Sequence, residues 1–467
     1  MKELTKNIIL NKILYILILI VPVLSLKVQA QDSLTYDNFI DLVKVYHPTA
    51  KRAKLQNQKG ELIVKDARGN FDPVLKSEYK EKYFQSTHYY LLFDAELYIP
   101  TASPINVKVG HFNNGGTFLN QENFNPDKGE STEGLTYIGV EIPLGSGLFT
   151  DKSRTGLKVA KELQKQKLAT SDLTLNDLLF NASLAYWDWY KYHKMAENLE
   201  NATQVGRDRL EYVKKEFFTG ESAGLDTLKA FVLWQNRNQN YLEAKRNAIS
   251  AFYQLNVFLW DEDLVLKQEL IPQSNIEQRK TVNLTPTISN NHPSLRYYLS
   301  RNAEEIAKTR LKKEKLRPKL DLELNLLTEG FIPESSDFGV NHSAGLKFYY
   351  PIFTRSARSQ VKLGTIKVQE TMLKYELKRR QLTNKLTDQI KQHTLISDQV
   401  NIMEETMNAY EKLINSEKIK FSIGESSLFE LNTWEQQMIN NQNKLIKLKN
   451  KLAQNRAKIQ WTRFDWE

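Results

Sequence analysis

The 467-residue sequence contains no cysteine, which excludes disulfide bonds and thiol catalysis. It also lacks a phosphate-binding loop and a His-Glu-x-x-His zinc signature, and its seven histidines are scattered. No block of Lys and Arg alternates with aromatic residues, although the formal net charge is +10, and this disfavours nucleic-acid binding. We therefore expect a protein that is not an enzyme, with no catalytic residue, no metal and no cofactor.

Long apolar runs are missing too, apart from one at the N-terminus. Three lysines precede an apolar run over 13–26, which ends at a small-x-small site at 28–30. The run is about 14 residues long, short of the roughly 20 that a membrane-spanning helix needs, and Pro22 interrupts it. We predict a cleaved signal peptide over 1–30 rather than a membrane anchor. The remaining chain is either soluble outside the cytoplasm or crosses a membrane as strands.

An internal repeat organises the chain. The first copy is predicted over 31–260 and the second over 291–467, with a linker over 261–290 between them. The offset between matching positions falls from 245 to 204 residues, so the first copy holds 41 extra residues. The matching segments are His47-Pro48 with His292-Pro293, Phe149-Thr150 with Phe353-Thr354, and Gly220-Glu221-Ser222 with Gly424-Glu425-Ser426.

Each copy contains two segments in which apolar and polar residues alternate. These lie at about 75–83 and 137–142 in the first copy, and at 320–326 and 344–350 in the second. Strict alternation predicts strands with one apolar and one polar face, as in a membrane barrel around a water-filled lumen or in a soluble two-layer sheet. The extra segment at about 83–136 is expected to form an extracellular loop, with room for one extra hairpin. Within it, 113–116 and 123–129 read as loops.

Apolar and small residues recur in steps of three and four over 175–217, 382–421 and 431–459. This heptad pattern predicts helices that pack side by side as coiled coils. A helix from about Lys152 to Phe217 would be on the order of 100 Å long. The helices expected over 33–68 and 222–260 are each roughly half that length. Four strands cannot close a barrel, and an open edge is not tolerated in lipid, so several chains are needed.

These features resemble the TolC family of outer-membrane efflux proteins over nearly the whole mature chain. The residues that carry the resemblance are the two His-Pro pairs, the strand-leading Pro73 and Pro318, the junctions Ile142-Pro143-Leu144 and Tyr350-Pro351-Ile352, and the helix turns at 217–226 and 421–430. Each motif alone is weak, but duplication in the same order with matching spacing makes the set specific.

The resemblance implies a mixed α+β membrane protein. A long antiparallel coiled-coil helical barrel would join a transmembrane β-barrel that is completed by trimerisation, with four strands per chain and about twelve in all. The protein would lie in the outer membrane with its helices in the periplasm. Its partners would be two further copies, outer-membrane lipid, a periplasmic adaptor and an inner-membrane pump. It would form the exit duct of a tripartite efflux pump or a type I secretion system. The alternative is a soluble periplasmic coiled-coil scaffold.

The resemblance also implies roles for residues at the two helix turns. Glu430 would form an acidic constriction, although Ser427 and Glu430 also fit a helix capping box. The family's basic residue is replaced by Ser426, which puts a salt bridge to Asp226 in doubt, and a further family acid is replaced by Thr433. Adaptor contacts are expected at the turns themselves, through Gly220, Leu225, Gly424 and Phe429. Both glycines also fit helix C-caps.

Overall fold

The computed structural model describes residues 33–117, 134–260, 271–273, 285–329 and 341–466, so the predicted signal peptide lies outside the described residues. The chain divides into two compact units. The first contains residues up to His47 with 181–282 and 395–454, and the second contains 48–180, 283–394 and 455–467. Each predicted repeat therefore contributes to both units.

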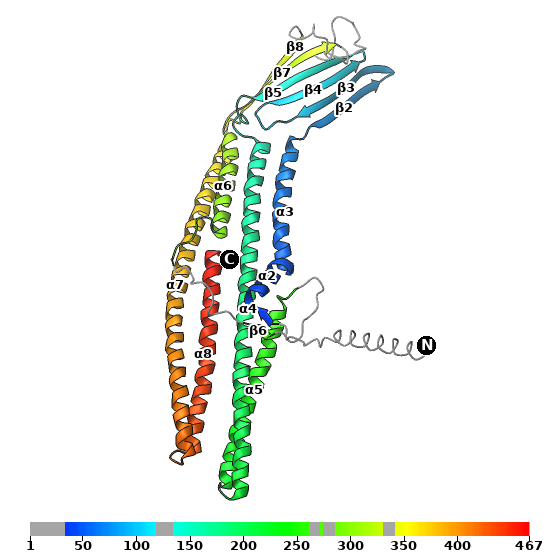
Figure 1. Ribbon diagram of the computed structural model, residues 1–467. Helices are drawn as coiled ribbons and strands as arrows, with labels where there is room; N and C mark the ends of the chain where they lie inside the picture. Colours follow the sequence, from blue (N-terminus) through cyan, green and yellow to red (C-terminus); the bar gives the residue numbers. More distant parts are fainter. Residues whose placement is uncertain (1–32, 118–133, 261–270, 274–284, 330–340, 467) are drawn as a thin grey trace, which may run out of the picture. The chain divides into compact units, whose positions relative to one another are not determined.

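The first unit consists mainly of helices (Figure 1). Two turns join long helices into hairpins, one between α4 and α5 and one between α7 and α8. The elements with residues in this unit are α2 (Tyr36–Tyr46), α4 (Lys152–Thr219), α5 (Gly224–Asn256), α7 (Arg355–Ser422) and α8 (Leu428–Arg463), with the short strands β1 (Ser33–Thr35) and β6 (Ile271–Gln273). Among the described helices, none is long and apolar enough to cross a membrane.

An aromatic cluster forms the core of the first unit where α2 packs on α4. Tyr36 stacks on Trp187 with ring centroids 5.2 Å apart, and Phe39 stacks on Tyr186 at 5.5 Å. The buried Tyr186 hydroxyl donates to the Leu34 carbonyl at 2.8 Å. The aromatic run that begins at Tyr186 therefore serves helix packing.

The second unit holds the half-length helices α3 (Pro48–Arg68) and α6 (Pro293–Glu314). Both begin with proline, whose missing N–H costs nothing in the first helical turn. The preceding histidines have structural roles. His47 ends α2 and stacks on Phe258 with centroids 5.9 Å apart, whereas His292 caps α6 by accepting a 3.1 Å hydrogen bond from the Ser294 amide at Nδ1. The single helix predicted over 33–68 is wrong, because β1 occupies its start and His47 separates α2 from α3. The helix predicted over 222–260 is found as α5.

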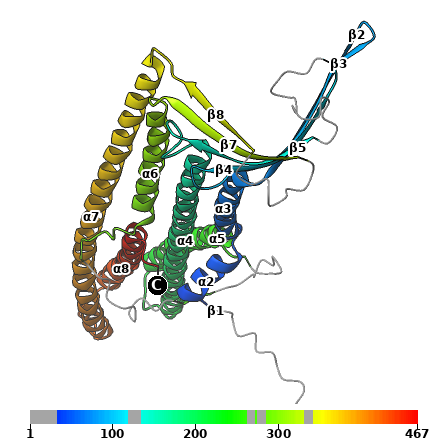
Figure 2. The same cartoon turned by 90° about the horizontal axis from the view of Figure 1, so that it is seen from above.

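A curved antiparallel sheet of six strands completes the second unit (Figures 1 and 2). The strand order is β2-β3-β4-β5-β7-β8, so strands of the first repeat pair with those of the second where β5 meets β7. The strands are β2 (Val74–Phe84), β3 (Thr87–Ile99), β4 (Asn106–Gly115), β5 (Leu135–Pro143), β7 (Lys319–Glu329) and β8 (His342–Tyr349). A short 3-10 helix, η2 (Gly69–Phe71), links α3 to β2.

The sheet confirms the four predicted strands and adds two more from the extra segment, β3 and β4. In the described residues this sheet therefore has six strands, where the family resemblance implies four barrel strands per chain. The loop predicted at 113–116 is wrong for its first three residues, because Asn113, Asn114 and Gly115 pair with β3. Only Gly116 has the positive φ of a turn residue. The loop predicted at 123–129 lies outside the described residues.

Candidate functional site

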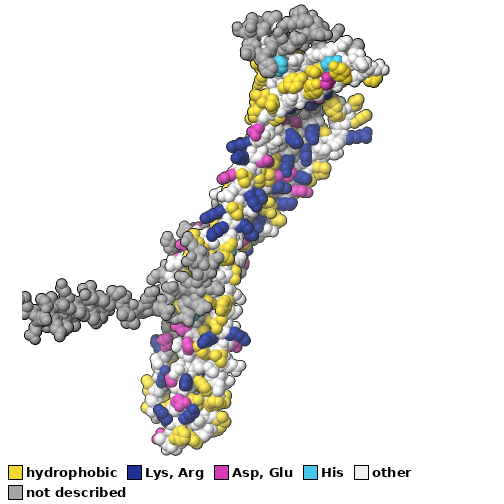
Figure 3. All heavy atoms as spheres, turned by 90° about the vertical axis from the view of Figure 1, so that its right-hand side faces the viewer, with side chains coloured by type: hydrophobic (Ala, Val, Ile, Leu, Met, Phe, Trp, Pro, Cys, Tyr) yellow, Lys and Arg dark blue, Asp and Glu magenta, His cyan; other side chains and the backbone are white. Residues whose placement is uncertain are grey.

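The six-stranded sheet has an inverted distribution of polar and apolar residues. On its apolar face Leu346 and Phe348 are 64% and 68% exposed, whereas Lys108 and Asp321 on the opposite face are each 8% exposed. Over β4, β5 and β7 the polar residues shelter one another, so the polar face is crowded there. Towards the two edges it is open, because the side chains of Lys76 on β2 and Lys347 on β8 are 57% and 76% exposed. Hydrophobic side chains gather on the visible surface of the sheet in Figure 3. The register places Leu75, Tyr79, Phe93, Leu97, Val109, Ile138, Val140, Leu322, Leu324 and Leu326 on the apolar face.

Strand glycines let side chains lie flat across the polar face. The Tyr137 ring covers Gly110, where an added Cβ would lie 2.3 Å from the Tyr137 Cζ atom. From this position the Tyr137 hydroxyl donates to Glu96 on β3 at 3.0 Å, across the intervening strand β4. A glycine in a strand marks a close approach of this kind, and it also permits the sheet to bend.

A second contact of the same type links strands of the two repeats. Lys108 on β4 donates to Glu323 on β7 at 2.6 Å, so its side chain crosses β5 at its cross-strand neighbour Gly139. Lys347 on β8 reaches the other oxygen of Glu323 at 3.1 Å. One carboxylate thus joins three strands and carries two positive partners, which leaves the polar face with mixed and largely paired charge.

Helices α4 and α7 end in the same way at the two turns. Gly220 and Gly424 have φ angles of +83° and +78°, which only glycine adopts readily. The next amides, of Glu221 and Glu425, donate back to carbonyls five residues earlier at 2.9 Å. This is the Schellman arrangement of a helix C-terminus, and it confirms the prediction that both glycines are C-caps.

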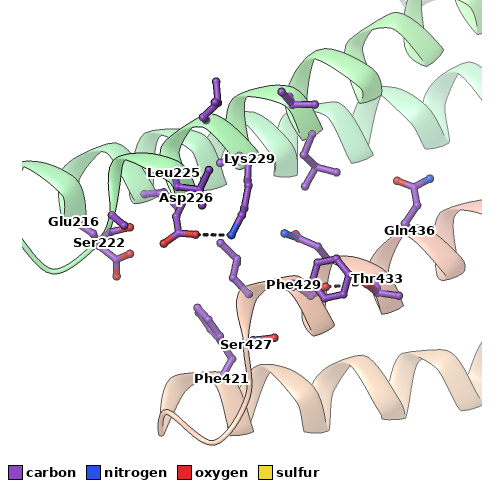
Figure 4. A pocket seen from close by; sticks show the side chains of 18 of the residues that line it. Glu216, Ser222, Leu225, Asp226, Lys229, Phe421, Ser427, Phe429, Thr433 and Gln436 are labelled. Atoms are coloured by element: carbon purple, nitrogen blue, oxygen red, sulfur yellow. Dashed lines mark hydrogen bonds and ion pairs between the residues drawn. The ribbon is translucent and has the colours of Figure 1, made fainter.

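A cavity of about 1030 Å³ lies between the two hairpins, close to their turns (Figure 4). Leu225 and Asp226 line it from the first hairpin, and Phe421 and Phe429 from the second. Its remaining lining includes aliphatic side chains of α5, amides of α8 and the charged residues Glu216, Glu221 and Lys229. Leu225 and Phe429 are largely exposed even though they line the cavity, so it is open to solvent.

Glu430 begins α8 next to this cavity. Its backbone amide donates to the Ser427 hydroxyl at 3.2 Å, which is the hydroxyl half of the predicted capping box. The Glu430 side chain is exposed, and no ion pair involves it among the described residues. The capping interpretation is therefore supported, and the carboxylate points to no partner within the described chain.

The structure does not bring Asp226 and Ser426 together. Asp226 pairs with Lys229, one turn along its own helix, at 3.1 Å (Figure 4). The Ser426 hydroxyl donates instead to Glu417 on its own hairpin. The doubt about a cross-hairpin bridge at these positions is thus justified.

A buried ion cluster that the sequence did not reveal lies further from the turns. Arg209 on α4 grips Glu435 on α8 with two hydrogen bonds of 2.8 Å, and Arg237 on α5 contacts the same carboxylate at 3.3 Å. Arg237 is only 2% exposed and also donates to the Ala202 carbonyl. The signal was present, because Arg237 continues a seven-residue spacing of buried alanines, Ala230, Ala244 and Ala251.

Burial by itself raises the pKa of the Glu435 carboxyl, but the hydrogen bonds and charges of Arg209 and Arg237 outweigh burial and lower that pKa below its ordinary value. Burial also lowers the pKa of Arg237, against the opposing charge of Glu435. The cluster therefore holds charged groups in a buried environment without water, where each charge is stabilised by its partners. It joins helices of both repeats within the first unit.

Comparisons with known proteins agree with this geometry. Residues 286–460 match the family model "Outer membrane efflux protein". No curated protein matches the sequence. Within the described residues, no group of three His, Asp or Glu side chains is placed to hold a metal ion.

Three solved structures show the same fold at low sequence identity. The Campylobacter jejuni CmeC outer membrane channel is 14% identical, with a TM-score of 0.63 over 91% of this chain and 84% of its own. The Vibrio cholerae outer membrane protein VceC is 13% identical, with 0.61 over 91% and 95%. The open state of the Neisseria gonorrhoeae MtrE outer membrane channel is 11% identical, with 0.62 over 91% and 87%.

The predicted resemblance, the predicted outer-membrane location and the expectation of a non-enzymatic protein all agree with these matches. The matched residues cover the second predicted repeat, and the likeness of fold covers nine tenths of the chain. The second predicted repeat thus matches the outer membrane efflux protein family model, and the chain as a whole has the fold of TolC-like outer-membrane channels.

Proposed function

We propose that the protein is the outer-membrane exit duct of a tripartite efflux pump or a type I secretion system. The inverted sheet is the observation that carries this proposal. An apolar face that is exposed, opposite a polar face that is crowded, suits a wall with lipid outside and water inside. The soluble scaffold is less well supported, because in water the exposed apolar face would be an aggregation site.

The working form is proposed to be a homotrimer in outer-membrane lipid. The sheet ends in β2 on one side and β8 on the other, each with one neighbour. Lipid does not tolerate such unpaired edges, so further copies must cover them. The helices also expose apolar side chains that a neighbouring copy would bury, among them Leu228, Val232, Leu242 and Ile249 on α5.

The hairpin turns are proposed to receive a periplasmic adaptor, which in turn connects to an inner-membrane pump. The cavity between the turns is large enough for several side chains of a partner, and its rim exposes Leu225 and Phe429. Apolar anchors that fill such pockets supply most of the binding free energy at protein interfaces. Gly220 and Gly424 keep the turns small enough for close approach.

Glu430 is proposed to line the narrow end of the duct. Three copies would place three carboxylates around the axis, and a ring of this kind favours cations. Ser426 and Asp226 contribute to the same end through their own hairpins, without a bridge between them.

Planar-bilayer conductance of the purified mature protein tests this function. We expect stable channels that prefer cations, and a lower cation preference in Glu430→Gln. Glu425→Gln is the matched control, because Glu425 is an exposed acid in the same turn. Channels whose selectivity is unchanged in Glu430→Gln would leave the residue as a helix cap only. A folded trimer that never conducts, even when Asp226→Ala loosens the turn, would favour the scaffold.

A further inference from the structure

The hairpin of β3 and β4 is the main departure of this chain from the four-strand pattern of its family resemblance. Continuous antiparallel pairing joins it to the sheet on both sides. β2 pairs with β3 from Val74 opposite Tyr98 to Phe84 opposite Thr87, and β4 pairs with β5 from Asn106 opposite Glu141 to Phe112 opposite Leu135. By backbone pairing the hairpin is an integral part of the sheet.

The hairpin also follows the inverted division of the sheet into two faces. Its apolar face carries Phe93 and Leu97 on β3 and Val109 on β4, in register with Leu75 and Ile138 of the flanking strands. A loop in water has no reason to keep this register of apolar side chains. A wall in contact with lipid requires it along every strand.

Polar contacts on the inner face run across all six strands, and the hairpin lies in the middle of the series. They are Lys76 with Glu96 at 3.2 Å, Tyr137 with Glu96 at 3.0 Å, Lys108 with Glu323 at 2.6 Å, and Lys347 with Glu323 at 3.1 Å. Two of these contacts skip a strand, and both involve a residue of the hairpin. Removing the hairpin from the wall would break three of the four.

The two open edges have compatible directions. β2 leads away from helix α3 and β8 leads back into helix α7, so β2 of one copy and β8 of the next would meet antiparallel. Every neighbouring pair around a closed wall would then be antiparallel, as in bacterial outer-membrane barrels.

We infer that copies of this chain meet through β8 of one and β2 of the next, with β3 and β4 inside the wall, and that the membrane wall therefore contains eighteen strands. This inference rests on the proposed trimer and on the six strands that each chain contributes in its larger sheet. Barrel diameter grows with strand number, and walls of about 16–18 strands enclose an aqueous channel. The membrane part is therefore wider than the twelve-stranded wall of the family resemblance.

The alternative places β2 and β3 outside the wall. β4 would then be the edge that meets β8 of the next copy, which gives four strands per chain and twelve in all. The two arrangements predict different neighbours for β8, so the interface itself distinguishes them.

Cross-linking exploits the absence of cysteine from the sequence. Two double variants are made. One combines Ser77→Cys on β2 with Leu346→Cys on β8, and the other combines Val109→Cys on β4 with Leu346→Cys. All three positions lie on the apolar face, three residues from the helix-side end of their strands. Outer-membrane fractions of each double variant and of the three single variants are treated with a flexible bis-maleimide and separated on a denaturing gel.

We expect covalent dimers and trimers from Ser77→Cys with Leu346→Cys, at least tenfold above the single variants, and none from Val109→Cys with Leu346→Cys. The reverse result overturns the inference and establishes the twelve-stranded wall. If neither pair cross-links in protein that still forms conducting channels, the edges do not meet. The inference then fails, while the proposed function stands. If the protein is absent from the outer-membrane fraction and does not conduct, the proposed function fails as well.

Discussion

The helical hairpins and the sheet bury opposite kinds of residue. In the helices, Tyr186 and Leu386 are completely buried and the charged residues lie mostly outside. In the sheet, Leu346 and Phe348 are exposed while Lys108 is buried. The same chain obeys the same rule in both places, which is that apolar surface avoids water. This difference is the one expected of the proposed membrane wall, with water on its inner side and lipid on its outer side.

The buried ion cluster is one exception among the helices, as are Glu304 and Glu305 of α6. Breaking this cluster should have the largest effect. Glu435→Gln leaves Arg209 and Arg237 without their carboxylate. We expect the free energy of unfolding to fall by about 3–5 kcal/mol, because a buried charge then has no partner. Chemical denaturation followed by helical circular dichroism measures this loss.

Glu243→Gln is the control for that experiment. Glu243 forms an exposed pair with Arg246 at 3.9 Å, and pairs of this kind contribute at most about 1 kcal/mol. Equal losses in the two variants would mean that the cluster is open to water.

A charge placed on the apolar face tests the sheet. Leu324→Arg should lower the free energy of unfolding in vesicles by about 2–4 kcal/mol, because an arginine then faces hydrocarbon. Asn325→Arg places the same charge on the polar face, one residue along the strand, and should cost much less. The assembled fraction recovered from outer membranes provides a second measure. Similar losses in both variants would indicate water on both faces.

The crowding of the polar face predicts a smaller effect. A Cβ at Gly139 would lie 2.9 Å from the Leu324 carbonyl oxygen and closer still to the Asn325 side chain. Gly139→Ala should therefore cost about 1–3 kcal/mol of unfolding free energy, a usual size for overpacking. At Gly115 the added Cβ meets nothing within 4 Å, so Gly115→Ala is the matched control. If both variants lose the same unfolding free energy, the sheet is less tightly packed at Gly139 than described.

The smallest expected effect concerns pH and the helical part. Burial, with the charges of Lys378 and Arg296, lowers the pKa of His292 from 6.5 to about 4. The folded state therefore disfavours the proton that the unfolded chain binds. The contribution to stability is complete above pH 6.5 and is lost as the pH falls towards 4.

His292→Asn keeps a capping side chain and removes this titration. Its melting temperature should fall less than that of the wild type between pH 7 and 4. Part of the slope will remain, because burial also lowers the pKa of His47 and His393. His342→Gln, at an exposed strand end, serves as the control. An unchanged slope in His292→Asn would assign the acid sensitivity to other groups.

Sequence periodicity was sufficient for the long elements. The helix expected over Lys152 to Phe217 is found as α4, which ends at Thr219, and the four alternating segments are strands. These elements are long, and each repeats its own pattern many times, so local sequence determines them. The two C-cap glycines were predictable for the same reason, because a helix end needs a left-handed residue.

The extra hairpin was harder to predict, because some of its side chains on the polar face of the sheet are themselves apolar. Leu91, Leu92 and Phe93 follow one another in β3 without alternation, since Leu92 lies on the inner face. Asn113 and Asn114 have turn chemistry, yet pairing with β3 holds them in a strand. The ion cluster joins residues more than two hundred positions apart, so only the folded chain shows that Glu435 meets Arg209.

The short pair of β1 and β6 has a consequence for the order of assembly. Ser33 pairs in parallel with Ile271, which the ribosome adds about 240 residues later. The α4–α5 hairpin between them needs only nearby sequence, whereas β1 has no partner until the segment after that hairpin has been made. Strand β1 is therefore synthesised early and paired late, and it must be kept from pairing with other strands in the interval.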